Sequence, residues 1–202
     1  MGGTKMRKII IIGASGHGKV IADIAILNGY ENIVFLDDNE NIKECAGFPV
    51  VGQTNAAVHM DGDKIVAIGN AKMREKIQKD IVGAVTLIHP KAVIGRGVIL
   101  GEGTVVMPGA IINTGVSIGK GCIVNTGATV DHDSKIGDFV HIAVGAHLAG
   151  SVRIGNRSWI GAGSIVINNL SICEDCMIGA GAVVVKDIME SGTYVGVPAK
   201  RR

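Results

Sequence analysis

The sequence predicts a chain of two unlike parts: an α/β unit with a small, Rossmann-like parallel sheet over residues 1–87, and an all-β parallel β-helix over residues 88–202. Short aliphatic runs in the first part alternate with amphipathic segments and one glycine-rich turn. The second part repeats an aliphatic residue every six positions. Only 3% of the residues are aromatic, against 30 glycines, which favours a core of thin, repeated layers.

The order of elements predicts the α/β unit. Met1 to Lys5 look like an irregular extension, and Lys8 to Ile12 form an aliphatic run ended by glycine, which indicates a buried strand. Apolar spacing predicts a helix over Lys19 to Leu27. The remaining expected elements are strands over 33–36 and 64–68 and a helix over 73–81. This β-α-β order indicates a parallel sheet of the doubly wound type.

The turn Gly13 to Gly18 joins the first strand to the first helix, where free N–H groups and the helix dipole attract an anion. Asp37 and Asp38 end the second strand, where a carboxylate can meet ribose hydroxyls. The unit is too short for a whole nicotinamide site but can hold one nucleotide. The predicted substrate-binding residues are Ser15, Gly16, His17, Asp37, Asp38 and Gly69. A tight structural turn with solvated aspartates remains the alternative.

The second part follows one period. The aliphatic positions are Ile88, Ile94, Leu100, Val106, Ile112, Ile118, Val124, Val130, Ile136, Ile142, Leu148, Ile154, Ile160, Val166, Ile172, Ile178 and Val184. The next residue is often Gly, Asn or Asp, which suits a corner that needs a permissive backbone. Chance alternation is hard to sustain over so many periods. The pattern resembles the hexapeptide-repeat family, whose left-handed β-helix has three six-residue sides per coil. That resemblance implies about five coils, with residues eighteen apart stacked.

Both parts together resemble the NeuD/PglD-type sugar acetyltransferases of surface-glycan and glycoprotein biosynthesis, over almost the whole chain. The resembling motifs are residues 10–18, 35–38, 67–70, 131–133, 136–141 and 196–201. The resemblance implies acetyl transfer from acetyl-CoA to the amino group of a nucleotide-linked sugar, closest to the UDP-4-amino-sugar N-acetyltransferases, with no metal.

His132 is the most distinctive of the six histidines. It occupies an outward corner between Asp131 and Asp133, and an adjacent carboxylate can orient an imidazole and stabilise its protonated form. An ordinary polar corner histidine is the alternative. The resemblance implies that His132 is the general base and Asp133 its supporting acid, although the family usually has Glu there.

Stacking by eighteen places Gly150 one coil above His132, roughly 4.8 Å away, where a bare backbone lets a thioester approach. The resemblance makes the Gly150 N–H a contact to the acetyl-CoA carbonyl and thus the oxyanion donor; a plain turn glycine is the alternative. His141 resembles a CoA-contacting histidine of the family, whereas His147 is expected at the surface.

In related enzymes CoA lies in a groove between neighbouring β-helices, and these assemble as trimers. By position, main chain near Ala162 and Ala180 would meet CoA, and Lys200 and Arg201 would meet its phosphates or form a solvated tail. We expect a homotrimer that covers an apolar coil face, assigned to the following residues: Ile99, Val105, Ile111 and Ile123.

The near-neutral net charge of +2 gives no reason to expect nucleic acid as a partner, and no stretch suits membrane insertion or a secretory signal. Four cysteines with a single C-x-x-C pair, Cys173 and Cys176, favour reduced thiols in a cytoplasmic protein over zinc. Three alternatives stay open: O-acetylation of a sialic-acid-type sugar, a non-catalytic binding or assembly module, and a zinc site built from His132, His141 and His147 across a trimer interface.

Overall fold

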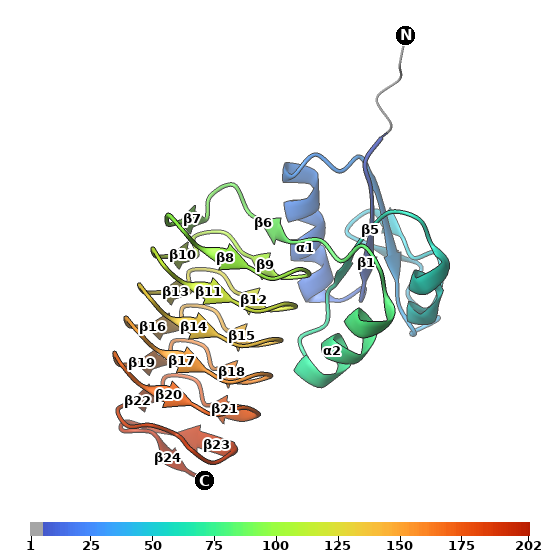
Figure 1. Ribbon diagram of the computed structural model, residues 1–202. Helices are drawn as coiled ribbons and strands as arrows, with labels where there is room; N and C mark the ends of the chain where they lie inside the picture. Colours follow the sequence, from blue (N-terminus) through green and yellow to red (C-terminus); the bar gives the residue numbers. More distant parts are fainter. Residues whose placement is uncertain (1–5) are drawn as a thin grey trace. The chain divides into compact units, whose positions relative to one another are not determined.

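A computed structural model describes residues 6–202, and the predicted irregular extension Met1–Lys5 lies outside this part of the chain. The chain divides into two compact units, Met1–Leu87 and Ile88–Arg202 (Figure 1). Each unit has its own hydrophobic core.

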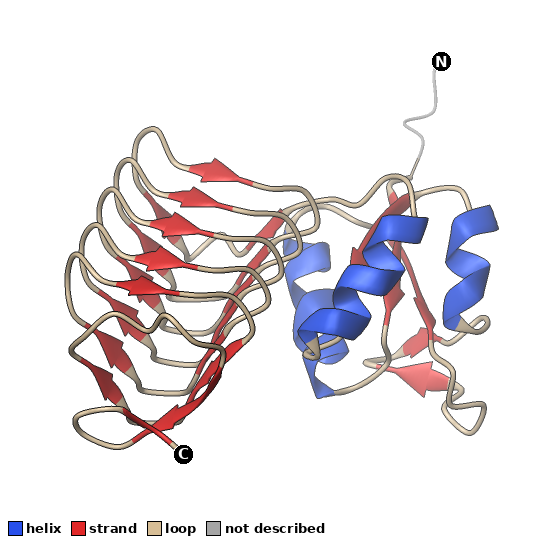
Figure 2. Ribbon diagram, turned by 60° about the horizontal axis from the view of Figure 1, so that its bottom comes forward, coloured by secondary structure: helices blue, strands red, loops and turns tan. Residues whose placement is uncertain are grey.

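The first unit is built on a three-stranded parallel sheet with the order β2-β1-β5. Its strands are β1 (Lys8–Ile12), β2 (Asn32–Leu36) and β5 (Asp63–Val66). The central strand β1 pairs on both edges and its four isoleucines are fully buried, as expected for a run without polar alternation. The helices α1 (Gly16–Leu27) and α2 (Ala71–Asp80) follow β1 and β5 (Figure 2).

The predicted elements exist, with shifted ends. Helix α1 begins at Gly16, three residues before the expected Lys19, because the glycine turn already has helical geometry. Gly18 permits this close packing, since a Cβ there would lie 2.3 Å from the carbonyl oxygen of Gly13. Three short elements lack a periodic signal in the sequence and were not predicted: β3 (Glu44–Cys45), β4 (Phe48–Pro49) and the 3₁₀ helix η1 (Thr54–His59).

The second unit is a parallel β-helix in which each of the predicted aliphatic positions lies at the end of a short strand (Figure 1). The strands are β6 (Leu87–Ile88), β7 (Val93–Ile94), β8 (Ile99–Leu100), β9 (Val105–Val106), β10 (Ile111–Ile112), β11 (Ser117–Ile118), β12 (Ile123–Val124), β13 (Thr129–Val130), β14 (Lys135–Ile136), β15 (His141–Ile142), β16 (His147–Leu148), β17 (Arg153–Ile154), β18 (Trp159–Ile160), β19 (Ile165–Val166), β20 (Ser171–Ile172), β21 (Cys176–Ile178), β22 (Val183–Val184), β23 (Gly192–Val195) and β24 (Lys200–Arg201).

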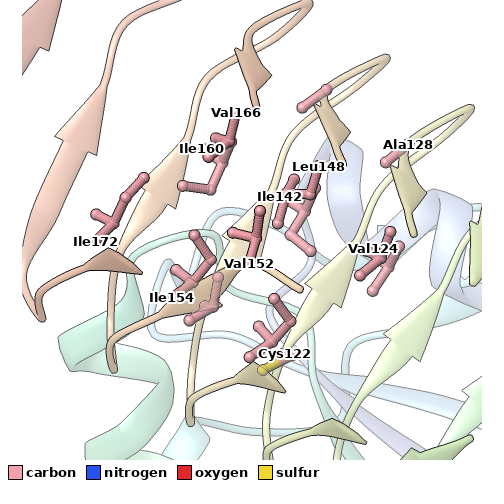
Figure 3. Close-up of a cluster of buried hydrophobic side chains, with 14 of the residues drawn as sticks. Cys122, Val124, Ala128, Ile142, Leu148, Val152, Ile154, Ile160, Val166 and Ile172 are labelled. Carbon is pink, nitrogen blue, oxygen red and sulfur yellow. The ribbon is translucent and has the colours of Figure 1, made fainter. Parts of the chain in front are cut away.

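Successive strands belong to three different sheets, which we name after their first strands. The β6 sheet has eight strands (β24-β23-β21-β18-β15-β12-β9-β6), the β7 sheet six (β22-β19-β16-β13-β10-β7) and the β8 sheet five (β20-β17-β14-β11-β8). From β6 to β22, parallel partners are eighteen residues apart, for example Ile112 and Val130, which confirms the predicted stacking. The last parallel pair, β21 with β23, is offset by sixteen residues. Each coil contributes one strand to the β7 sheet, and this sheet has six strands, so the β-helix has six coils rather than about five. The inward aliphatic side chains form continuous buried columns (Figure 3).

The corners differ from the prediction in one respect. From Ile94 to Ile178, the backbone adopts positive φ three residues after the aliphatic position, for example at Gly97, Gly115 and Asp133, not one residue after it. Glycine occurs directly after the strands for another reason, which is lack of space. A Cβ at Gly101 would lie 2.4 Å from the backbone nitrogen of Lys120 in the next coil. Close stacking of coils, not a left-handed backbone, therefore selects glycine there.

The expectation of a single exposed apolar coil face is wrong. Ile99 is 67% exposed on β8 and Ile111 is 38% exposed on β10, whereas Val105 and Ile123 on the β6 sheet are each 1% exposed. Only residues eighteen apart share a side, so these four residues occupy three different sides.

Candidate active site

His132 lies at the corner between β13 and β14, where the chain turns from the β7 sheet to the β8 sheet. Its side chain is 54% exposed, and its Nδ1 lies 2.9 Å from Oδ2 of Asp133. A carboxylate oxygen accepts only, so the proton of a neutral imidazole belongs on Nδ1 and the lone pair on Nε2. The corner thus presents an outward imidazole with a basic nitrogen available.

The two neighbouring carboxylates raise the pKa of this imidazole. The hydrogen bond from His132 Nδ1 to Asp133 first, and the charge of Asp131 second, raise the pKa of His132 above its usual value. Asp133 reaches the ring from a left-handed backbone with φ of 58°. Aspartate is one of the few side chains that accepts this conformation readily.

Gly150 is stacked on the imidazole, as the eighteen-residue rule predicts. A Cβ on Gly150 would lie 2.6 Å from Nε2 and 2.7 Å from Cε1 of His132, so every other residue would displace the ring. The Gly150 N–H donates no hydrogen bond to any residue that the structure describes, whereas its carbonyl accepts from the Asn169 N–H. A free amide next to a basic nitrogen suits the support of an oxyanion.

His141 lies on β15, in the β6 sheet, and is 6% exposed. Its Nε2 lies 3.0 Å from Nδ2 of Asn125, and its ring centroid lies 4.1 Å from that of Trp159 in the next coil. Sequence reasoning missed Asn125 and Trp159 as neighbours. Trp159 could have been found by adding eighteen to His141.

Ala162 and Ala180 are exposed and stacked at the corner that follows the β6 sheet. Their N–H groups donate to no residue within the described part of the chain, which leaves them open to a ligand. Lys200 and Arg201 form β24, which pairs antiparallel with β23. Arg201 also binds Glu190 and the carbonyl of Ser191. Lys200 and Arg201 are therefore exposed side chains held in a hairpin.

These residues form two groups on different parts of the β-helix. His132, Asp133 and Gly150 share the corner between the β7 and β8 sheets, which lies opposite the β6 sheet of the same coil. His141 belongs to the β6 sheet, and Ala162 and Ala180 to the corner after it. One β-helix does not bring the two groups together.

The glycine turn of the first unit also presents free donors. Ser15 is the exposed N-cap residue of α1 but makes no capping side-chain bond, and a Cβ on Gly16 would meet nothing within 4 Å. Burial, and secondly the charge of Arg74, lower the pKa of His17 to about 4. The buried Nε2 of His17 has no partner among the described residues. His17 is therefore a neutral imidazole at physiological pH, close to the N-terminus of α1.

The predicted aspartates have partners within the protein. Asp37 accepts from the Ala14 N–H at 2.7 Å, and Asp38 accepts from the N–H and hydroxyl of Thr54. Gly69 accepts from the buried guanidinium of Arg74 at 2.8 Å. A cavity of about 450 Å³ lies after the carboxyl ends of the strands, where ligands of α/β sheets bind. Its lining includes Asp38, Thr54, Val58, Ile68, Met73 and Ile77.

Residues 8–81 match the PglD N-terminal domain family, and residues 151–186 match the bacterial transferase hexapeptide family of six repeats. The acetyltransferase domain of PglB from Neisseria gonorrhoeae FA1090 is 42% identical, with a TM-score of 0.94, over 97% of this chain and 100% of that one. PerB from Caulobacter crescentus, solved with CoA and GDP-perosamine, is 36% identical over all of both chains, with a TM-score of 0.91. WeeI from Acinetobacter baumannii AYE is 30% identical, with a TM-score of 0.89, over 97% of this chain and 100% of that one.

The chain belongs to the PglD-type sugar acetyltransferases. Membership of this family makes it an acetyl-CoA-dependent sugar acetyltransferase with a left-handed β-helix. A non-catalytic binding module is therefore set aside.

This acetyltransferase has no group of three His, Cys, Asp or Glu side chains placed to hold a metal within residues 6–202. His132 lies at the corner after the β7 sheet, whereas His141 lies on the β6 sheet and His147 on the β7 sheet. A single chain therefore does not bring the three histidines together. In the same part of the chain, no helix has the length and apolar character needed to cross a bilayer.

Proposed function

We propose that this protein transfers the acetyl group of acetyl-CoA to the amino group of a nucleotide-linked amino sugar, with His132 as the general base. The arrangement that carries the proposal is the corner imidazole held by Asp133 at 2.9 Å beneath the unbonded amide of Gly150. Two of the similar proteins described above are an acetyltransferase domain and an enzyme solved with CoA and GDP-perosamine.

The reaction follows from these groups. The sugar amine attacks the thioester carbonyl while Nε2 of His132 takes its proton, and Asp133 and Asp131 stabilise the resulting imidazolium. The Gly150 N–H donates to the oxyanion of the tetrahedral intermediate. Collapse of the intermediate breaks the carbon–sulfur bond, and CoA leaves as the thiol after protonation.

For the sugar nucleotide, we propose the first unit as the binding site. Ser15, Gly16 and His17 offer donors at the N-terminus of α1 to the diphosphate, and Asp37, Asp38 and Gly69 line the carboxyl edge of the sheet. The cavity that Asp38 borders offers a mixture of apolar and polar side chains to a nucleobase or sugar.

We further propose a homotrimer, in a cytoplasmic setting where acetyl-CoA is available. Because the two groups of site residues lie on different parts of one β-helix, a neighbouring β-helix has to supply the CoA-binding residues to each His132. His141, Ala162, Ala180, Lys200 and Arg201 are the residues proposed for CoA. Val93, Ile111 and Ile165 on the β7 sheet are exposed apolar residues between the two groups, which a subunit contact would remove from water.

An acceptor panel tests the proposed function. Release of the CoA thiol is measured with nucleotide-linked 4-amino sugars and, separately, with sialic acids as hydroxyl acceptors. We expect turnover with an amino sugar and none above background with sialic acids. Turnover confined to sialic acids would establish O-acetylation instead, and measurement of the sedimentation coefficient tests the trimer.

A further inference from the structure

The coil that precedes the catalytic corner supports it through Asn113. This residue lies one coil below Asp131, and its Nδ2 donates to Asp131 Oδ1 at 2.7 Å. The same oxygen accepts the backbone N–H of His132 at 2.8 Å. A single carboxylate oxygen therefore connects Asn113 to the main chain of the proposed base.

The two aspartates beside His132 have different tasks. Asp133 binds the ring nitrogen, whereas Asp131 makes no hydrogen bond to the imidazole in the described structure. The pKa of Asp131 is lowered, first by the Asn113 hydrogen bond and second by the His132 N–H, so Asp131 is ionised at neutral pH. Its charge acts on the imidazole without direct contact, and Asn113 fixes where that charge lies.

Two further contacts join the coil that contains Asn113 to the corner that contains His132. The Asp133 N–H donates to the Thr114 carbonyl at 3.2 Å. Gly115 leaves room for the Asp133 carboxylate, since a Cβ there would lie 2.7 Å from Oδ1. At the position of Asn113, the coils before and after this pair carry Gly95 and Ala149, whose side chains form no hydrogen bond. The polar link is thus specific to the coil that bears His132.

We propose that Asn113 is a positioning residue for acetyl transfer: it holds Asp131, and through Asp131 the corner that aims His132 Nε2 at the space beside Gly150. Asn113 does not itself touch the reacting atoms. The inference rests on the proposed role of His132 as general base.

Three variants separate the hydrogen bond from the charge. Asn113→Ala removes the donor and is expected to lower kcat about tenfold, the effect of one hydrogen bond to a charged group, with KM for acetyl-CoA unchanged within about twofold. Asn113→Asp opposes two carboxylates and should lower kcat at least as much. Asn113→Asp combined with Asp131→Asn restores a donor–acceptor pair with reversed polarity. Its kcat should recover to within about threefold of wild type, while the acid limb of kcat/KM moves to lower pH because the charge has left position 131.

Asn156→Ala is the matched control. Asn156 Oδ1 accepts from the Asp138 N–H at 2.8 Å, so this variant also removes one hydrogen bond between coils, but at the corner between β14 and β15. It should keep wild-type kcat. Equal losses of kcat and melting temperature in both alanine variants, or no recovery in the double variant, would overturn the role of Asn113. His132→Ala is measured alongside: if it is inactive while Asn113→Ala has wild-type kcat, only the inference fails, and if it retains turnover, the proposed base fails.

Discussion

Two outward histidines of the β-helix, His132 and His147, form superficially equal pairs with different chemistry. His132 Nδ1 lies 2.9 Å from Asp133 Oδ2 at a corner, and His147 Nδ1 lies 2.9 Å from the Thr129 hydroxyl along the β7 sheet. Both imidazoles belong to exposed residues. The distance is the same, and the partner and the surroundings differ.

The partner decides what each imidazole can do. A carboxylate fixes the proton on Nδ1 and stabilises the imidazolium, whereas a hydroxyl donates or accepts and leaves the tautomer open. The next coil differs as well, because His132 is covered by Gly150 and His147 pairs with Ile165. His132 therefore has a bare backbone beside Nε2, whereas His147 has the side chains of Thr129 and Ile165 as its neighbours in the adjacent coils. We therefore propose that the place in the hexad, and not exposure, decides which of these two histidines acts as the base.

Removing each imidazole gives the largest expected difference. His132→Ala should lower kcat about 10³-fold, within the usual range for a general base, and His147→Ala should change it less than about threefold. Both residues are outside the buried columns, so far-ultraviolet circular dichroism should stay unchanged. Because His147 pairs with Ile165 on the proposed subunit contact, the sedimentation coefficient is measured to verify that each variant keeps the wild-type assembly. The initial rate of thiol release at saturating acetyl-CoA gives the comparison. Similar losses for the two variants would assign no special role to the corner.

Gly150→Ala tests whether the close packing of the His132 ring on the bare backbone of Gly150 matters. The new Cβ would lie 2.6 Å from Nε2, so the ring has to move, and displacement of a reacting group by about 1 Å can cost about 10²-fold in rate. We expect kcat to fall between about 10- and 100-fold. KM for acetyl-CoA should change less, since the Gly150 amide remains. A crystal structure of the variant should contain a displaced His132, and a wild-type kcat would contradict the stacked geometry.

The sequence was sufficient for the β-helix because each strand is determined by its own hexad. Ile88 to Val184 recur at one spacing, and the stack of Gly150 on His132 follows from counting eighteen residues. Corner backbone conformation did not follow from composition, because glycine serves two purposes in the repeat. Gly101 makes room for Lys120 of the next coil, and Gly97 provides the positive φ.

The α/β unit was harder, since its loops depend on tertiary contacts. No periodic pattern in the sequence marks η1, whose first residue Thr54 binds Asp38. No such pattern marks the hydrogen bond from the Ala14 N–H to Asp37 either. The position of Asn113 under Asp131 was within reach of the sequence, because it follows the same eighteen-residue rule as Gly150. The sequence neighbours of His132 do not reveal this contact, because Asn113 is distant along the chain and lies under Asp131 only through the stacking of coils.

The smallest expected effect is a shift of the pH profile. A general base works when it is unprotonated, so kcat/KM should rise as pH increases through the pKa of His132. Asp133→Asn keeps a side chain that accepts the left-handed backbone and can still bind Nδ1, but replaces the carboxylate, whose hydrogen bond contributes most to raising this pKa, by a neutral amide. The pKa of His132 should fall, and the acid limb of the profile should move to lower pH.

The acceptor amine titrates equally in both enzymes, so the difference between the two profiles reports the enzyme group alone. The same substitution weakens stabilisation of the imidazolium, so the plateau at high pH should be lower than in wild type. An acid limb at the same pH in both enzymes would mean that the titrating group is not the imidazole bound to Asp133.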